Sequence, residues 1–328
     1  MREAVKPIDM TQIEAARARL ADLAIASPLL DCDAARAFDA GATSKSIRLK
    51  LENLQPIGSF KIRPIGNAVL ARARGDLSEG IYTTSSGNSA LGVAFMARRL
   101  GIPATAVVPQ NAPRAKLERL RRLGARIDMR STDEWWRAIE RGALEDQAGV
   151  YIDAVRDPLA LAGDATLALE ILREWPDVEA ILVPFGGGGL ACGIGCALRL
   201  LRPDVKIIAC ELESAHPLEA AFEAGTPVET PHEAGFVSGV GFGSVLPEMW
   251  PLAKAMIDAV ITVSLAQVAD AIKLLAERNH VVAEGAGALS VAAALAGKYA
   301  ERRVCAVVSG GNLDALTLAA ILEGRVPA

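Results

Sequence analysis

Histidine is scarce in this chain of 328 residues, with only three, at positions 216, 232 and 280. So few imidazoles leave little material for a histidine-rich metal centre, and they favour chemistry that does not depend on histidine. Aromatic residues are also few (7 Phe, 4 Trp and 3 Tyr), which argues against a surface on which nucleic-acid bases stack. The 35 basic and 39 acidic residues give a formal net charge of −4, so no strong positive field attracts nucleic acid or anionic membranes. We therefore expect no nucleic-acid partner and no membrane partner.

Cysteine usage and the chain start indicate the compartment. The five cysteines are odd in number and widely spaced, which argues against a disulfide framework and for a reducing environment. Residues 1–20 lack the apolar core of a signal peptide. The uncharged stretch 180–198 contains Pro184 and four consecutive glycines, so it is not a membrane span. These features predict a cytoplasmic protein.

Strand-length apolar runs alternate with helix-length amphipathic segments, which is typical of an α/β protein with parallel sheets. A chain of this length is expected to hold about two domains, and segments 80–150 and 180–328 read as two α/β lobes. Expected strands are 80–84, 104–109, 125–130, 180–185, 205–211, 259–263 and 303–308. Expected helices are 89–100, 114–123, 164–174, 190–201, 265–277 and 285–296.

Four consecutive glycines, Gly186 to Gly189, separate the predicted strand 180–185 from the helix that follows. Glycine lets several backbone N–H groups converge at a helix N-terminus, a geometry that binds phosphate or carboxylate. The alternative is a turn for close packing of helix and strand, but four glycines exceed what packing needs. A loop that binds a nucleoside triphosphate requires a lysine after its glycines, and no lysine follows here. Residues 285–290 match a dinucleotide fingerprint incompletely, without its third glycine.

Three further polar loops, 83–89, 237–245 and 309–312, lie at or near predicted strand ends, where ligands bind in α/β sheets. Ordinary capping also explains each loop taken alone.

Lys61 lies between Phe60 and Ile62 in an apolar stretch. Apolar surroundings lower the pKa of an ammonium and make it a nucleophile and base, although a lone lysine beside a phenylalanine is more often a surface residue.

Five motifs occur in one order: SFKIR at 59–63, SSGN at 85–88, GGGGL at 186–190, EGAGA at 284–288 and SGGN at 309–312. In order and rough spacing they resemble the fold-type II pyridoxal-phosphate (PLP) enzymes, of the serine/threonine dehydratase and serine racemase group. The resemblance extends over about residues 12–315. It implies a tryptophan synthase β-like fold of two open parallel-sheet α/β domains. These would be a large cofactor-binding domain (1–75 and 156–328) and a small mobile substrate domain (76–155).

The resemblance also implies pyridoxal 5'-phosphate as the cofactor and assigns residues to it. Lys61 would form the Schiff base with the cofactor aldehyde and act as base on the substrate Cα. Asn88 would hydrogen-bond the ring hydroxyl, and the N–H groups of Gly186, Gly187, Gly188 and Gly189 would hold the phosphate. Ser309 would face the pyridine nitrogen, where a neutral hydroxyl favours β-elimination over transamination. The other residues expected at the cofactor are Phe60, packed near it, Leu190, Gly239, Glu284 near the ring edge, and Gly310.

The same resemblance places Ser85, Ser86, Asn88 and Ser89 around the substrate. Ser86 would lie on the cofactor face opposite Lys61, where a hydroxyl can reprotonate Cα as a racemase requires; a hydroxyl that only binds carboxylate is the alternative. Many relatives have histidine where this chain has Ser89. Trp135 occupies the place of an arginine that meets the substrate carboxylate in racemase-like relatives, and domain packing is its alternative role.

The sequence departs from the family pattern at two further places, one of which affects the backbone and the other a metal site. Arg63 is followed by Pro64, where many relatives have glycine, so the backbone beside Lys61 is expected to follow a different path. Relatives that bind Mg²⁺ or Ca²⁺ use an acid, a carbonyl and a second acid. Here only Glu211 and the Ala215 carbonyl match, because Pro217 replaces the second acid.

The resemblance predicts a PLP-dependent dehydratase, or ammonia-lyase. It would convert a β-hydroxy-α-amino acid such as threonine, serine or a hydroxyaspartate-like analogue to a 2-oxo acid and ammonia. An amino-acid racemase of the serine or aspartate type is the first alternative, and a non-catalytic PLP or amino-acid binding protein is the second. A β-substituent-exchanging synthase is less favoured because it needs a second nucleophile. The family also implies a homodimer.

Overall fold

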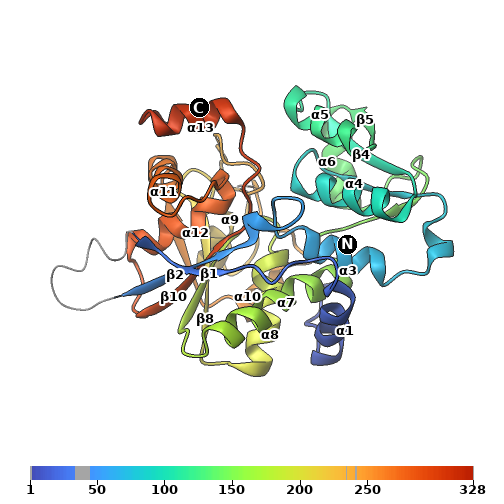
Figure 1. The fold of residues 1–328 in the computed structure, drawn as a ribbon. Coiled ribbons are helices and arrows are strands. Elements are labelled where there is room, and N and C mark those ends of the chain that lie inside the picture. Colours follow the sequence, from blue (N-terminus) through green and yellow to red (C-terminus); the bar gives the residue numbers. More distant parts are fainter. Residues whose placement is uncertain (1, 34–44, 234, 241, 328) are drawn as a thin grey trace.

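The structure is a computed structural model that describes residues 2–33, 45–233, 235–240 and 242–327. Gly241, which belongs to the predicted glycine-rich connection 237–245, lies outside the described residues. Two separate β-sheets organise the chain, one in each of the two parts seen in Figure 1. This agrees with the predicted α/β architecture with two parallel sheets.

The larger sheet has six strands in the order β1-β2-β10-β7-β8-β9. β1 is antiparallel to β2, and the other neighbours pair in parallel. The strands are β1 (Leu29–Asp31), β2 (Ser46–Leu51), β7 (Ala180–Pro184), β8 (Lys206–Leu212), β9 (Ala259–Val263) and β10 (Arg303–Val308).

The smaller sheet has four parallel strands in the order β5-β4-β3-β6. They are β3 (Ile81–Thr84), β4 (Ala104–Pro109), β5 (Arg126–Arg130) and β6 (Val150–Tyr151). All of these strands lie within the segment predicted to be the small domain.

Helices cover both sheets and connect their parallel strands. The first group is α1 (Met10–Leu20), α3 (Ile62–Leu70), α4 (Asn88–Leu100), α5 (Arg114–Arg122), α6 (Thr132–Arg141) and α7 (Pro158–Glu174). The second is α8 (Gly189–Leu201), α9 (Pro217–Ala224), α10 (Trp250–Met256), α11 (Leu265–Arg278), α12 (Gly285–Ala296) and α13 (Ala315–Leu322). Two 3-10 turns, η1 (Glu52–Leu54) and η2 (Arg74–Leu77), complete the elements. No helix in the described part of the chain is long and apolar enough to span a membrane.

The two faces of the larger sheet bury separate cores because successive side chains of a strand point to opposite faces. In β7, Ile181 and Val183 pack with α1, α7, α8 and α10. Ala180 and Leu182 pack with α11 and α12 on the other face (Figure 1). A third core joins α3 and α4 to the smaller sheet. A sheet buried on both faces explains why its strands are continuous apolar runs in the sequence.

The predicted strands and helices are present, with shifted ends. The largest shift is at α7, which begins at Pro158 rather than at 164, because the Asp157 side chain accepts a hydrogen bond from the Leu159 N–H and caps the helix. α3 runs without interruption from Ile62 although it contains Pro64. Proline is tolerated there because the first-turn N–H groups of a helix have no intrahelical partner.

Candidate active site

The loops predicted to bind a ligand follow the carboxyl ends of parallel strands. SSGN follows β3 of the smaller sheet, whereas the glycine run follows β7 and SGGN follows β10 of the larger sheet. Side-chain hydrogen bonds bring the first and third loops together, since the Asn312 Nδ2 donates to the Asn88 Oδ1 at 2.7 Å. The site is therefore formed between the two sheets.

Lys61 lies directly before α3, at the N-cap position of that helix. Its segment is attached to the SGGN loop: the Phe60 N–H donates to the Ser309 carbonyl at 2.9 Å, and the Gly311 N–H donates to the Gly58 carbonyl at 2.9 Å. The Lys61 Nζ is 4.8 Å from the centre of the Phe60 ring. Burial lowers the pKa of Lys61, an effect that the negative charges of Asp164 and Asp153 oppose. A buried amine with a lowered pKa fits the predicted role of nucleophile and base.

The glycine run forms a tight loop that leads into α8. Gly188 has a φ of 92°, a conformation that favours glycine, and no side chain caps the helix. A Cβ on Gly186 would lie 2.3 Å from the Gly239 carbonyl oxygen, so only glycine allows the 237–245 segment to approach this closely. The Leu190 side chain, in contrast, is buried in the core. The uncapped N-terminus of a helix of this length is an anion-binding site.

Asn88, Glu284 and Asn312 form a hydrogen-bonded group beside Gly310. The Asn88 Nδ2 donates to the Glu284 Oε1 at 2.6 Å, and the Asn312 Nδ2 also donates to the Ile57 carbonyl at 2.9 Å. Burial raises the pKa of Glu284 to about 7, against the hydrogen bond from Asn88. A Cβ on Gly310 would lie 2.2 Å from the Glu284 Oε1, which explains the glycine at this position. Asn312 was not among the residues predicted for the site, although its motif was.

The Ser309 side chain is buried at the end of β10, and its hydroxyl donates to the Ala286 carbonyl at 3.3 Å. No charged side chain takes this position. A hydroxyl here is compatible with the predicted contact to an unprotonated ring nitrogen.

The predicted substrate loop lies between β3 and α4. Ser85, Ser86 and Ser89 are half-buried, and the Ser85 hydroxyl accepts a hydrogen bond from the Gly87 N–H at 3.1 Å. No side chain caps α4, a helix of 13 residues that begins at Asn88. The loop therefore offers hydroxyls and backbone N–H groups of the kind that bind a carboxylate.

Trp135 belongs to a stack of three aromatic rings that joins α6 to the segment after Gly239. The Trp135 and Trp136 ring centres are 5.4 Å apart, and those of Trp136 and Phe242 are 6.0 Å apart. A Cβ on Gly186 would lie 3.4 Å from the Phe242 ring, so the stack reaches the glycine loop. The Trp135 Nε1 is buried without a hydrogen-bond partner. An indole N–H left unpaired in this way is available to a ligand.

Glu211 lies on β8, where its two carboxylate oxygens accept the N–H groups of Leu218 and Glu219 at 2.9 and 3.0 Å. Burial raises the pKa of Glu211 to about 7, against these two hydrogen bonds. Among the described residues, no group of three or more His, Cys, Asp or Glu side chains could hold a metal ion. The Glu211 oxygens are thus engaged by backbone N–H groups, and we assign no chemistry to a metal.

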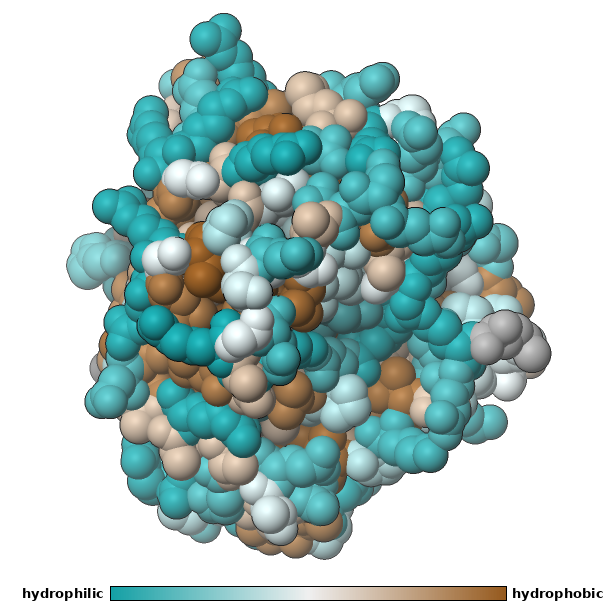
Figure 2. Space-filling model, turned by 90° about the vertical axis from the view of Figure 1, so that its right-hand side faces the viewer, coloured by the Kyte–Doolittle hydropathy of each residue, from teal (hydrophilic) through white to brown (hydrophobic). Residues whose placement is uncertain are grey.

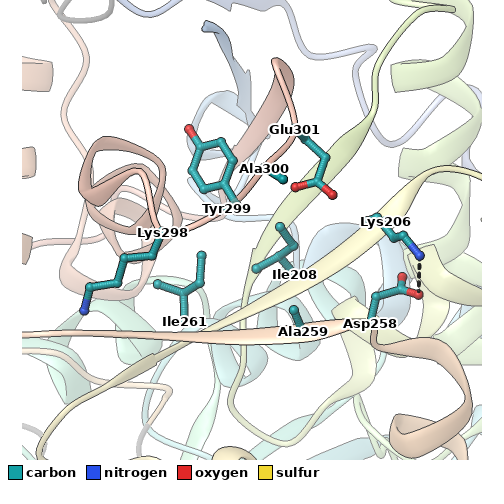
Figure 3. A pocket seen from close by; sticks show the side chains of 9 residues that line it. All are labelled: Lys206, Ile208, Asp258, Ala259, Ile261, Lys298, Tyr299, Ala300 and Glu301. Carbon is teal, nitrogen blue, oxygen red and sulfur yellow. Dashed lines mark ion pairs between the residues drawn. The ribbon is translucent and has the colours of Figure 1, made fainter.

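A surface pocket of about 300 Å³ lies at the opposite end of the larger sheet. Figure 3 shows its lining, which includes Lys206 and Ala259 at the beginnings of β8 and β9. Lys206 forms an ion pair with Asp258 at 3.6 Å. Because parallel strands begin at this end, the pocket is remote from the loops that surround Lys61.

The residues present fit PLP. A phosphate requires backbone N–H groups, which the uncapped glycine loop provides. An aldehyde requires an amine of lowered pKa, which Lys61 provides. In the predicted arrangement the Ser309 hydroxyl would face the ring nitrogen, Asn88 would hydrogen-bond the ring hydroxyl, and Glu284 would lie near the ring edge.

Comparisons with known proteins agree with this chemistry. The family described as "Pyridoxal-phosphate dependent enzyme" matches residues 23–310. The chain is 37% identical to an L-threonine ammonia-lyase of Geobacter sulfurreducens over 282 residues, which cover 84% of this chain and 70% of the relative. It is 30% identical to a serine racemase of Oryza sativa subsp. indica over 315 residues, or 93% and 91% of the two chains. The solved structure of maize serine racemase superposes with a TM-score of 0.88 at 30% identity, covering 97% of this chain and 98% of that one. This chain therefore belongs to the pyridoxal-phosphate-dependent enzymes of fold type II.

Proposed function

We propose that this protein is a PLP-dependent ammonia-lyase that dehydrates a β-hydroxy-α-amino acid. The substrate would be threonine, serine or a substituted analogue such as hydroxyaspartate, and the products a 2-oxo acid and ammonia. The observation that carries the proposal is a buried amine of lowered pKa, Lys61, attached through Phe60 to a neutral serine at the end of β10. Relatives named L-threonine ammonia-lyase, at 37% identity, support the same reaction.

PLP, when bound, supplies an electron sink for the electron pair left on the substrate Cα. The Lys61 Nζ accepts the proton from Cα, and its lowered pKa increases the fraction of neutral amine at physiological pH. The Ser309 hydroxyl would face the ring nitrogen of the cofactor without adding a negative charge. The N-terminus of α4 and the hydroxyls of Ser85, Ser86 and Ser89 bind the substrate carboxylate.

The test is an assay of purified holoenzyme with a panel of β-hydroxy-α-amino acids, in which the 2-oxo acid and ammonia are both measured. We expect equal amounts of the two products from at least one of them. Bound cofactor without turnover of any panel member would overturn the proposal, and would favour a non-catalytic binding protein instead.

Racemisation is a second candidate, supported by the Ser86 hydroxyl and by the similarity to serine racemases. A racemase needs a second proton donor on the face opposite Lys61, and the Ser86 side chain is half-buried at the substrate loop. Chiral analysis of the recovered substrate separates the two reactions. Inversion at Cα without loss of the hydroxyl identifies racemisation, whereas elimination consumes the amino acid.

We also propose that residues 76–155 form a small domain that moves relative to the rest of the chain. The smaller sheet lies entirely within this segment, which supports the division into domains, and its core is shared with α3 outside the segment. A cytoplasmic location is supported by the buried thiols of Cys192, Cys196, Cys210 and Cys305, none of which forms a disulfide.

We propose a homodimer as the assembled form. Exposed hydrophobic side chains include Leu54 and Val282, which are 49% and 46% exposed. Their segments are neighbours, because the Asn53 Nδ2 donates to the Val282 carbonyl at 3.1 Å. On the face drawn in Figure 2, hydrophilic residues predominate and hydrophobic residues form separate patches. We propose that the patch of Leu54 and Val282, which are exposed on neighbouring segments, contacts a second copy.

A further inference from the structure

Asp164, on α7, is a fully buried carboxylic acid for which the mechanism above has no role. The side chain is 0% exposed, and neither of its two carboxylate oxygens has a hydrogen-bond partner. An ionised carboxylate buried without partners is unfavourable unless a positive charge lies nearby. The group therefore requires a counter-charge or a proton.

The position of Asp164 is set by close packing of α7 between the beginnings of α3 and α8. A Cβ on Gly163 would lie 2.3 Å from the Arg63 carbonyl oxygen, so α7 touches the first turn of α3, directly after Lys61. A Cβ on Gly189 would lie 3.4 Å from the Asp164 Oδ2, and one on Gly193 would lie 2.7 Å from its Cβ. The carboxyl thus lies between the reactive lysine and the loop proposed to hold the phosphate.

The charged groups around Asp164 come from three elements. Lys61 and Arg63 at α3 favour its ionised form, and Glu52 of η1 disfavours it. Arg63 and Glu52 pair with each other at 2.7 Å, and their effects on Asp164 have opposite signs. Cys192 of α8 is a buried thiol whose pKa is raised by that burial. Lys61 is the largest favourable charge for Asp164, and Asp164 is the largest for Lys61.

We propose that Asp164 is the counter-ion of Lys61 and sets the pH at which the Lys61 amine becomes neutral. Asp164 is a positioning residue in this role, because it acts on the substrate only through Lys61. The proposal rests on the assignment of Lys61 as the reactive amine under the proposed function. Burial raises the pKa of Asp164 to about 8 and lowers the pKa of Lys61, in each case against the attraction of the other group.

This pairing has a consequence for catalysis. When the Lys61 amine is neutral, a protonated Asp164 keeps the pair at the same net charge. No unpaired negative charge is then left beside the glycine loop, where a phosphate must bind. Asp164 thus affects both the pKa of the Lys61 amine and the charge beside the loop proposed to bind the phosphate.

The first test measures Asp164 in cofactor-free protein, by carbon-13 NMR of aspartate labelled at the side-chain carboxyl carbon. We expect one aspartate to titrate near pH 8, and this titration to move to higher pH in Lys61→Met, which removes the positive charge at similar side-chain size. If no aspartate titrates above about pH 6, or if Lys61→Met leaves the titration unchanged, the counter-ion role is wrong. This readout does not involve turnover, so it can succeed even where the proposed reaction fails.

The second test measures Lys61 through the pH dependence of its reaction rate with PLP, followed by absorbance. Asp164→Asn removes the negative charge and is expected to move the midpoint of the profile at least about one pH unit lower, which corresponds to about tenfold more neutral amine below the midpoint. The matched control is Asp153→Asn. Asp153 also acts on Lys61, but the Arg156 Nε donates to its carboxylate at 2.6 Å, so a smaller shift is expected. Equal shifts, or none, would contradict the proposal, and thermal unfolding verifies that both variants are folded.

Discussion

At the residue scale, the environment of a side chain matters more here than its type. Lys61 is one of nine lysines in the sequence, and burial lowers its pKa against the opposing effect of two carboxylates that lie far away along the chain. The motif alone could identify Lys61 but not Asp164, which stands within an apolar helical run. The run LALAGDATLALEIL holds two charged residues, Asp164 and Glu170, and a charge within such a run was the available signal. Asn312 was similarly hidden in a loop that capping explains equally well.

Replacement of Lys61 tests its role directly. We expect Lys61→Ala to lower kcat by about 10²–10⁴-fold, since it removes the group that accepts the Cα proton. The measurement is steady-state 2-oxo acid formation with the best substrate of the panel. As a control, Lys254→Ala removes an exposed lysine of α10 and should retain most of the activity. Comparable loss in both variants would refute the assignment.

The buried carboxyl of Glu284 is expected to make the free energy of unfolding depend on pH. Its pKa is raised by burial from 4.5 to about 7 in the folded protein, so the folded state binds the proton more tightly than the unfolded state. The stability due to this proton is complete below pH 4.5 and is lost as the pH rises to about 7, by roughly 1.4 kcal/mol per pH unit. Glu284→Gln keeps an acceptor for Asn88 and removes the titration. The free energy of unfolding, measured with urea at pH 5 and pH 8, should differ less between the two pH values in the variant than in the wild type. An equal difference would exclude Glu284 as a source of the pH dependence.

At the scale of elements, helix ends decide where chemistry occurs. α4 and α8 both begin without a side-chain cap, whereas α6 and α11 are closed by capping boxes of Ser131 with Glu134 and Ser264 with Gln267. Capped helix ends satisfy their own N–H groups, so only the uncapped ends remain available to a ligand. The sequence predicted these two helices well because a glycine or serine loop precedes each of them.

The aromatic stack between α6 and Phe242 connects the small sheet to the glycine loop. Trp136→Ala removes this contact, and an aromatic pair contributes about 0.5–1.5 kcal/mol. We expect the KM of the substrate to rise by about 2- to 12-fold with a smaller change in kcat, measured by steady-state kinetics. Phe222→Leu is the control, because Phe222 packs edge to face against Trp250, with ring centres 5.3 Å apart, among the residues of the larger sheet's core. A similar change in KM for both variants would show that the effect is general destabilisation.

At the scale of the whole molecule, the site exists only because two sheets are brought together. Asn88 belongs to the segment after β3, and Glu284 and Asn312 to the larger part, yet the three side chains form one group. The Arg119 guanidinium of α5 also donates to Asn312, and the Lys116 Nζ donates to the Ser238 hydroxyl at 3.3 Å. These contacts connect the two parts on the side of the cofactor loops.

The proposed dimer is also a property of the whole molecule. Leu54→Asp combined with Val282→Asp places charges in the exposed hydrophobic patch, and we expect it to convert a dimer to a monomer in sedimentation velocity. Leu200→Asp is the control, since Leu200 is 51% exposed at the end of α8, away from this patch. A wild-type protein that sediments as a monomer would refute the homodimer itself.

The sequence by itself determined the fold class, the order of the elements and the motif residues, because apolar periodicity, glycine and serine are local signals. The family resemblance added the cofactor and the predicted roles of Lys61 and Ser309. Tertiary structure decided which distant groups meet: Asp164 with Lys61, Asn312 with Asn88, and Phe242 with Trp136. It also decided that the Glu211 oxygens are occupied by backbone N–H groups. These outcomes depend on packing between segments far apart in the chain, and pKa values depend on burial, which no local pattern specifies.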